Sequence, residues 1–272
     1  MSNHNFHLVD PSPWPLLTSV ASCGLVTAFA MFMHQYLYSG YGVLFFSFFL
    51  LLCVFCWWKD VIVEAIRDKV HTKFVKLGLR IGMVVFILSE AMFFFTFFWS
   101  FIKSWLGSVY VLEDAWPVSK ISWPPSGIKT LDPWNLPFLN TMILLLSGTT
   151  VTWGHYSLLK GDNKSLIRAL SVTVGLGVCF TVIQGYEYYH AAFSLGEEGY
   201  KSIYSSNFYM ITGFHGVHVI IGTIFLAICL LRAIGNQLTL KDHLGFEFAA
   251  WYWHFVDVVW IFLFIFVYCL GS

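Results

Sequence analysis

The sequence predicts an all-α, polytopic integral membrane protein with seven transmembrane helices, and three observations carry this prediction. Hydrophobic residues make up 58% of the 272 residues. Charged residues make up only 11%, whereas a soluble globular domain has about 25%. The apolar residues fall into seven runs, each long enough as a helix to cross a hydrocarbon layer about 30 Å thick. Because a bilayer offers the backbone no hydrogen-bond partners, each run is expected to be a helix.

The first two runs, 16–36 and 41–58, are separated by a few residues that include Ser39 and Gly40. So short a connection predicts a tight antiparallel hairpin of two helices. Trp14 precedes the first run, and Trp57 and Trp58 end the second. Tryptophan is favoured at the membrane interface, so these residues mark where the two helices leave the hydrocarbon.

The third run, 81–105, follows a polar stretch and carries one carboxylate, Glu90, near its middle. A carboxylate at that depth costs about 2.5 to 3.5 kcal/mol on insertion scales. We therefore expect Glu90 to be neutral, paired or in contact with water inside the bundle, and not to face lipid.

The segment 107–137 is rich in proline and tryptophan and is expected to be a surface loop. The remaining apolar runs are 138–159, 166–193, 203–231 and 246–270. Together the seven runs predict a single membrane domain over residues 1–272, with the two termini on opposite sides. Of the fifteen Lys and Arg residues, four fall on the side of the carboxyl terminus, which leaves eleven on the side of the amino terminus. The four are Lys103, Lys120, Lys129 and Lys201. By the positive-inside rule the amino terminus faces the cytoplasm or matrix, and the carboxyl terminus faces the periplasm or intermembrane space.

Five ionisable residues are expected at about the same membrane depth, in the third, sixth and seventh runs: Glu90, His215, His218, His254 and Asp257. His215 and His218 are three residues apart, as are His254 and Asp257, so each pair can point toward another helix. The pattern favours a hydrogen-bonded clamp that fixes how the helices pack. A proton relay or regulatory site is the functional alternative.

Two further classes of protein stay open on the residues alone. One is a free-standing seven-helix proton-linked transporter or channel that uses Glu90 and the histidines. The other is an intramembrane metalloenzyme, because H-x-x-H at His215 and His218 can supply two ligands. The metal interpretation is disfavoured, since His4, His7, His71 and His243 are expected in loops and His34, His155 and His190 near run ends. We predict no metal ligands and no bound cofactor in this chain.

A basic and aromatic cluster is expected on the side of the amino terminus. It comprises Trp57, Trp58, Lys59, Glu64, His71, Arg80 and Arg232. Cationic side chains flanked by tryptophan at this level can hold phospholipid head groups. The ordinary positive-inside signal is the alternative. Lys plus Arg equal Asp plus Glu at fifteen each, so the charge gives no indication of nucleic acid. No phosphate loop, nucleophile elbow or H-E-x-x-H motif points to an ATPase or a hydrolase.

Several stretches, in order along nearly the whole chain, resemble subunit III of cytochrome c oxidase, the haem-copper terminal oxidase. They include HLVDPSPWP at 7–15, SEAMFFFTFFW at 89–99, TGFHGVHVIIG at 212–222 and GFEFAAWYWHFVDVVW at 245–260. The sequence departs from the family at Lys59, where arginine is common, and at Tyr156, where the family has histidine.

The resemblance implies a two-plus-five arrangement of helices around a lipid-filled cleft, without a redox centre of its own. It further implies that the chain stabilises catalytic subunit I among other subunits of respiratory complex IV, with haem and copper held by partner subunits. No catalytic residue is expected here. Glu90 falls on the family's carbodiimide-reactive carboxylate, and the basic and aromatic cluster falls on or near its lipid positions. The implied location is the mitochondrial inner membrane, with the bacterial plasma membrane as the alternative.

Overall fold

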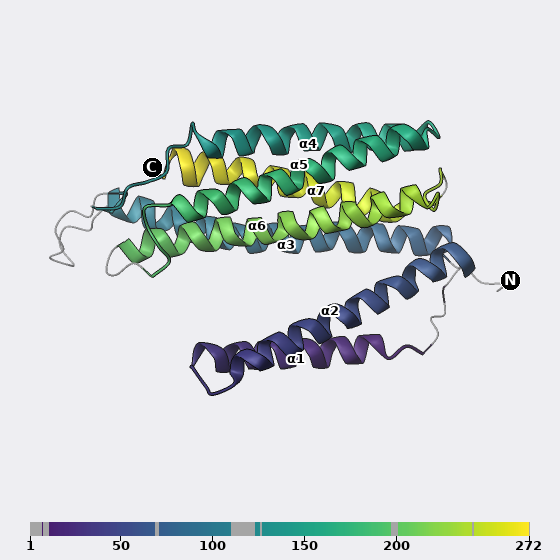
Figure 1. Cartoon of the computed structure of the whole chain (residues 1–272), viewed down its shortest axis with the longest axis horizontal. Coiled ribbons are helices and arrows are strands. Elements are labelled where there is room, and N and C mark those ends of the chain that lie inside the picture. The colour runs from purple at the N-terminus through teal and green to yellow at the C-terminus, as the bar shows by residue number, and fades with distance from the viewer. Residues whose placement is uncertain are drawn as a thin grey trace. The chain divides into compact units, whose positions relative to one another are not determined.

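A computed structural model describes residues 7, 11–68, 71–109, 123–125, 127–196, 201–240 and 242–271. Those residues form seven long helices and two short π-helical segments, one after α2 and one after α7 (Figure 1). The long helices are α1 (Trp14–Met33), α2 (Ser39–Val63), α3 (Lys73–Val109), α4 (Leu136–Leu159), α5 (Asn163–His190), α6 (Lys201–Ile234) and α7 (Leu244–Leu263). The π-helical segments are η1 (Glu64–Asp68) and η2 (Phe264–Cys269). Within the described part of the chain, seven helices are long and apolar enough to cross a membrane, which confirms the predicted fold class.

Several helices extend beyond the apolar runs. The third begins at Lys73 rather than at 81, and the sixth continues to Ile234 rather than ending at 231. The reason is that hydropathy marks the hydrocarbon layer, while Lys, Arg and Leu continue a helix readily beyond it. Residues 110–122 of the predicted loop lie outside the described part of the chain.

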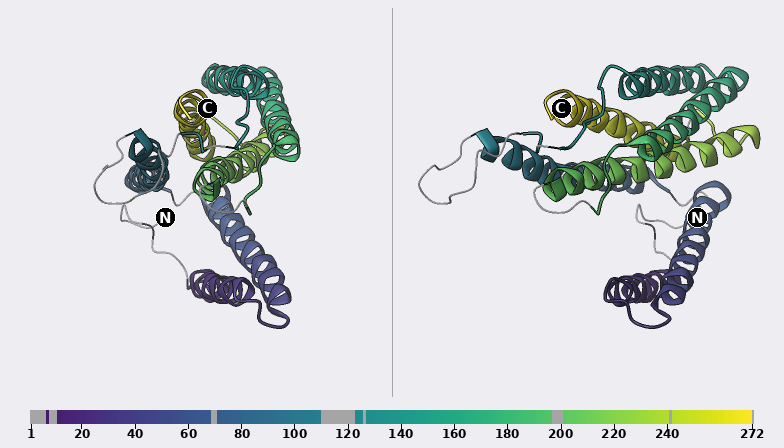
Figure 2. Two further views of the ribbon diagram at one scale, coloured as in Figure 1. Left: turned by 90° about the vertical axis from the view of Figure 1, so that its left-hand side faces the viewer. Right: turned by 60° about the vertical axis from the view of Figure 1, so that its left-hand side comes forward.

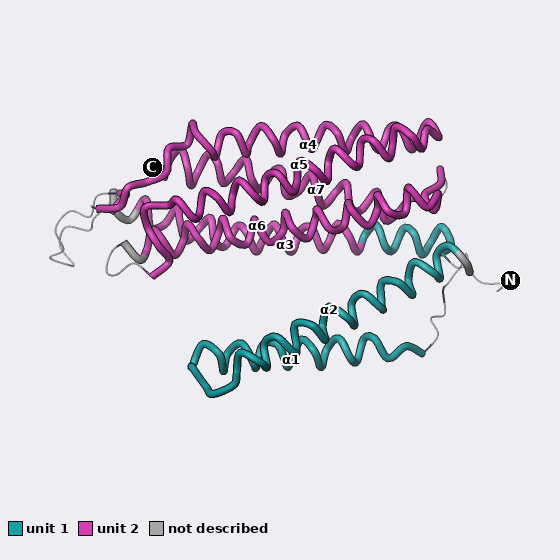
Figure 3. Tube along the Cα trace, in the orientation of Figure 1, with its two compact units in different colours: residues 1–81 teal, residues 82–272 magenta. Residues whose placement is uncertain are grey.

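The chain divides into two compact units, residues 1–81 and 82–272 (Figure 3). Within the first unit, α1 and α2 pack on one another through small residues. Ala21 and Ala28 are buried, and a Cβ atom at Gly24 would overlap the ring of Phe46. The indole Nε1 of Trp14 also donates a hydrogen bond to Asp60, from the start of α1 to the end of α2.

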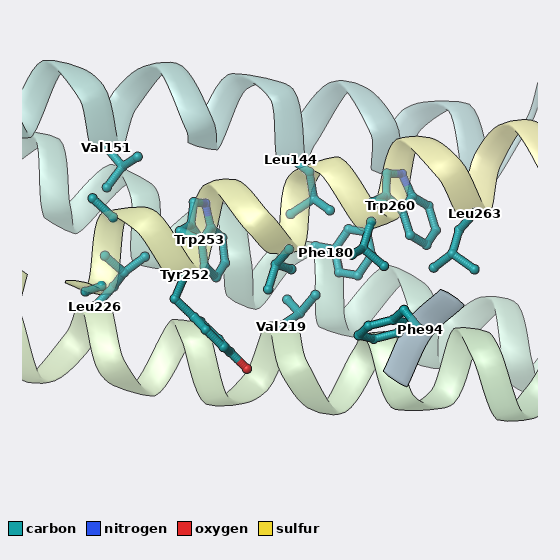
Figure 4. Close-up of a cluster of buried hydrophobic side chains, with 14 of the residues drawn as sticks. Phe94, Leu144, Val151, Phe180, Val219, Leu226, Tyr252, Trp253, Trp260 and Leu263 are labelled. Carbon is teal, nitrogen blue, oxygen red and sulfur yellow. The ribbon is translucent and has the colours of Figure 1, made fainter. Parts of the chain in front are cut away.

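The second unit is a bundle in which α7 packs against both α4 and α6 (Figures 2 and 4). Trp253 of α7 is fully buried and donates its indole N–H to the hydroxyl of Ser147 at 2.8 Å. It fits because Gly177 and Gly222 have no side chain there: a Cβ atom on either would lie 2.9 Å from the indole ring. Small residues of this kind let membrane helices approach closely.

A sharp turn joins α4 to α5. Gly161 adopts a left-handed backbone conformation with φ of 77° just after α4, which suits a residue without Cβ. Asp162 then caps α5, since its Oδ1 accepts from the backbone N–H groups of Lys164 and Ser165. The hydrogen bonds from Ser165 lower the pKa of the Asp162 carboxyl.

Candidate functional site

The carboxylate of Glu90 lies against the imidazole of His218, which α6 presents to α3. The distance from Glu90 Oε2 to His218 Nε2 is 2.8 Å. The other ring nitrogen, Nδ1, lies 2.6 Å from the carbonyl oxygen of Phe214. The Glu90 side chain is 23% exposed and that of His218 is 12% exposed, so both side chains are largely buried within the bundle.

The two contacts of His218 determine how many protons the pair holds. A carbonyl oxygen can only accept, so Nδ1 must carry a proton and donate it to Phe214. The contact between Nε2 and the carboxyl group then holds one proton, placed either on the ring or on Glu90. In both arrangements the pair is neutral overall. A neutral pair removes most of the cost of placing a carboxylate within a membrane helix.

Aromatic rings surround this pair. The rings of His218 and Phe94 are 5.0 Å apart in an edge arrangement, and Tyr252 of α7 stacks near His218 at 6.3 Å. Phe93 also lies 6.3 Å from the imidazole. These apolar rings fix the orientation of the imidazole and lower the local dielectric, which strengthens the hydrogen bond to Glu90.

His215 points elsewhere, although it lies only three residues from His218. Its ring lies 5.2 Å from that of Trp260 and 5.8 Å from that of Phe180. It is almost fully buried, and neither ring nitrogen has a hydrogen-bond partner among the described residues. The structure therefore separates the two histidines that H-x-x-H would need as joint ligands.

His254 and Asp257 face α4. The Nε2 atom of His254 lies 3.4 Å from the hydroxyl of Thr152, and the imidazole is exposed on the surface of the bundle. Asp257 is buried, with its carboxylate against Gly148, where a Cβ atom would be 2.6 Å from Oδ2. Glu90 pairs with α6 while these two residues contact α4, so the five residues are divided between separate contacts.

A second buried polar cluster was not foreseen from the sequence. Tyr268 of η2 donates a hydrogen bond to Glu187 Oε1 at 2.7 Å, and the amide of Gln184 lies 3.4 Å from the same hydroxyl. Gln184 also accepts from Asn140 of α4. The signal available in the sequence was Glu187 itself, a second carboxylate inside an apolar run.

The residues of the basic and aromatic cluster are divided between the two units. Trp58 is 61% exposed and Lys59 beside it is exposed, at the end of α2 in the first unit. Trp57 and Arg80 of that unit are half-buried.

In the same unit, Glu64 and His71 lie close to His7, which the sequence analysis placed in a loop without a role. Arg232 belongs to the second unit, where it is half-buried near the end of α6. Its Nε atom is buried and has no hydrogen-bond partner among the described residues.

These features define the class of protein: a seven-helix integral membrane protein whose intramembrane ionisable groups are mostly matched to partners within the bundle. Comparison with known proteins then gives the family. The chain belongs to the cytochrome c oxidase subunit III family, whose sequence profile matches residues 4–272.

Its relatives are similar over almost their full length. A probable cytochrome c oxidase subunit 3 of Rickettsia bellii (strain RML369-C) is 55% identical over 272 residues, covering 99% of this chain and 97% of the relative. The cytochrome c oxidase subunit 3 of Chondrus crispus is 49% identical, covering 100% of this chain and 96% of the relative. The cytochrome c oxidase subunit 3 of Arabidopsis thaliana is 48% identical, covering 99% of this chain and 97% of the relative.

The chain is therefore a subunit of cytochrome c oxidase, a proton-translocating oxidoreductase complex. The resemblance in the sequence is confirmed. Family membership decides against the free-standing transporter, since the chain is a subunit of an oxidase complex. It also decides against the intramembrane metalloenzyme, since this family has no redox centre of its own.

Proposed function

We propose that this chain stabilises catalytic subunit I of the oxidase and binds structural phospholipids, without taking part in electron transfer. The Glu90–His218 pair serves as a clamp between α3 and α6 rather than as a proton relay. The proposal for subunit I depends mainly on one observation, the exposed imidazole of His254.

His254 lies within about 4 Å, along the helix axis, of the middle of the membrane span Leu244–Cys269, given a rise of 1.5 Å per residue. An ionisable side chain at that depth rarely faces lipid. Thr152 of α4 is exposed beside it, so the two helices share a polar surface inside the membrane. This surface suits contact with another membrane subunit, and we assign it to catalytic subunit I.

Crosslinking in the assembled oxidase tests this assignment without disturbing His254. Val258 lies one helical turn further along α7, on the same face, and is 51% exposed. A photo-crosslinking amino acid at Val258 should form an adduct with the catalytic subunit. The matched control is Val182 of α5, which is 66% exposed and is expected to label lipid. Labelling of lipid alone from position 258 would refute the docking face.

The lipid proposal is supported by cationic and aromatic groups near helix ends. A guanidinium offers a planar fork of donors that matches a phosphate, and the buried Nε of Arg232 has no described acceptor. At the end of α2, Trp57, Trp58 and Lys59 combine interfacial rings with a cation. Both groups therefore suit anionic head groups. Glu64, His71 and Arg80 belong to the same unit as Trp57, Trp58 and Lys59, and we assign them to that second group.

Quantifying phospholipid in the purified complex tests this part. Arg232→Gln should reduce the number of phospholipids retained per complex. Lys160→Gln is the matched control, since Lys160 is exposed at the end of α4 and emerges on the same side of the membrane as the end of α6. Equal lipid retention in the Arg232 and Lys160 variants would contradict the assignment of Arg232.

For orientation, we place the amino terminus on the matrix or cytoplasmic side, because eleven of fifteen Lys and Arg residues are expected there. Relatives occur in bacteria and in a plant and an alga, so the membrane is the mitochondrial inner membrane or the bacterial plasma membrane. Labelling of a cysteine introduced at Lys160, in sealed vesicles of known orientation, decides the orientation. Access from the periplasmic or intermembrane side would reverse the assignment.

A further inference from the structure

Three side chains from separate parts of the first unit converge near the end of α2. They are His7, Glu64 and His71, and one ligand atom of each lies within 4.8 Å of the ligand atoms of the other two. The imidazole rings of His7 and His71 meet at 62° with their centroids 5.8 Å apart. All three residues are half-buried.

Local structure holds each of these residues in place. Glu64 is the first residue of η1, and π-helical turns occur frequently at functional sites. His71 directly precedes Thr72, whose side-chain and backbone oxygens accept from Val75 and Lys76 at the start of α3. His7 lies in the segment before α1, and the first residue of α1, Trp14, donates a hydrogen bond to Asp60, one helical turn before Glu64.

The donor set matches that of a transition-metal ion. Two imidazoles and one carboxylate bind Zn²⁺ at about 2.0 to 2.2 Å and leave a position for water or another oxygen ligand. Ligand atoms in such a tetrahedral site are about 3.3 Å apart. The upper limit of 4.8 Å in this group therefore needs only a small contraction, which rotation of three half-buried side chains can supply.

We propose that His7, Glu64 and His71 bind a divalent transition-metal ion of the Zn²⁺ type. The ion joins the segment before α1, the end of α2 and the residues that lead into α3. Its role is structural, because binding of a metal to the folded chain alone stabilises that fold. It also neutralises Glu64, which would otherwise repel the phosphate of a nearby head group.

Zinc content of the intact oxidase, washed with a chelator and then equilibrated with ⁶⁵Zn²⁺, tests this site. Wild type should bind one more zinc ion per complex than His7→Ala, Glu64→Gln or His71→Ala. Each variant should weaken binding by more than about 100-fold, since even outer-shell partners of a metal contribute about 10 to 100-fold. X-ray absorption at the zinc edge should show two imidazole nitrogens at about 2.0 to 2.1 Å.

Two control variants guard against indirect effects. His34→Ala removes an exposed histidine of the same unit outside this group and should leave zinc binding unchanged. His7→Cys keeps a ligand at the first position and should restore binding that His7→Ala loses. Equal zinc content in wild type and His7→Ala would overturn the proposal. So would unchanged zinc content in Glu64→Gln and His71→Ala variants that have lost phospholipid, since the group would then hold lipid alone.

Discussion

Replacing His218 by leucine should destabilise the second unit, because it leaves Glu90 without the partner that makes the pair neutral. A hydrogen bond to a charged group contributes about 1.5 to 3 kcal/mol, and breaking a fully buried pair costs about 3 to 5 kcal/mol. The 2.8 Å contact is short, but Glu90 is 23% exposed. We therefore expect a loss of about 2 to 3 kcal/mol in the free energy of unfolding.

Glu90→Gln provides the informative contrast. The amide of glutamine can donate to Nε2 of a neutral His218 while Nδ1 still donates to Phe214. This variant should lose less than about 1 kcal/mol. In a double-mutant cycle with leucine at both positions, the two replacements should be less damaging together than the sum of the single losses.

The assay is heating of the purified oxidase, followed by brief proteolysis and quantification of this chain from its own gel band. For a domain of this size, 1 kcal/mol corresponds to about 2 to 4 °C, so His218→Leu should lower the midpoint by roughly 4 to 12 °C. A His218→Leu variant with the midpoint of wild type would refute the clamp. So would a Glu90→Gln variant that assembles with normal lipid content but no longer pumps protons, because the carboxylate would then act in proton transfer.

Three other changes test the packing and the polar contacts. Gly222→Ala should lower the free energy of unfolding by about 1 to 3 kcal/mol, because the new Cβ would lie 2.9 Å from the buried Trp253. Gly216→Ala is the control: nothing lies within 4 Å of its Cβ position, so it should be neutral or slightly stabilising in the same thermal assay. Tyr268→Phe should cost about 1 to 3 kcal/mol by removing the donor to the buried Glu187, and a normal midpoint would mean that another group satisfies this carboxylate. The lowered pKa of Asp162 means that its ionised form stabilises the folded state at neutral pH, and that this contribution is lost as the pH falls through the folded-state pKa. Asp162→Asn keeps a side-chain oxygen that can cap α5 but has no ionisable group. Between about pH 6 and pH 3, the melting temperature of this variant should therefore change less than that of wild type. Parallel curves of melting temperature against pH for the two proteins would disprove this.

The sequence predicted the seven spans because hydropathy is averaged over all residues of an apolar run. This average does not depend on which side of the helix faces inward. The sequence could not predict which histidine meets Glu90. His215 and His218 differ by about 60° around the helix axis, given 3.6 residues per turn. Helix α6 is apolar on nearly every side, so its sequence does not reveal its rotation. In the structure one histidine reaches α3 and the other packs between Phe180 and Trp260.

The glycines show the same limit. Gly213, Gly216 and Gly222 of α6 all suit close helix packing by their sequence. Only at Gly222 would a Cβ atom meet a neighbour closer than 3.0 Å, namely Trp253. Gly177 of α5 packs on the same indole, although it is not part of a G-x-x-x-G motif. A motif of small residues therefore shows that close contact is feasible, while the large side chain opposite decides where it occurs.

Three carboxylates in the second unit lie against other elements of the bundle, and each contact joins a different pair of elements. Glu90 and Glu187 each make a hydrogen bond there, whereas Oδ1 of Asp257 is buried without a hydrogen-bond partner among the described residues. Glu90 of α3 meets His218 of α6, Glu187 of α5 accepts from Tyr268 of η2, and Asp257 of α7 lies against Gly148 of α4.

Apolar surfaces in a membrane discriminate poorly between rotations of a helix, because lipid is as apolar as the neighbouring helix. A misrotated helix would leave a carboxylate in hydrocarbon at a cost of about 2.5 to 3.5 kcal/mol on insertion scales. We infer that these carboxylates fix the rotation of the helices, and that each contributes more by penalising wrong packings than by strengthening the correct one.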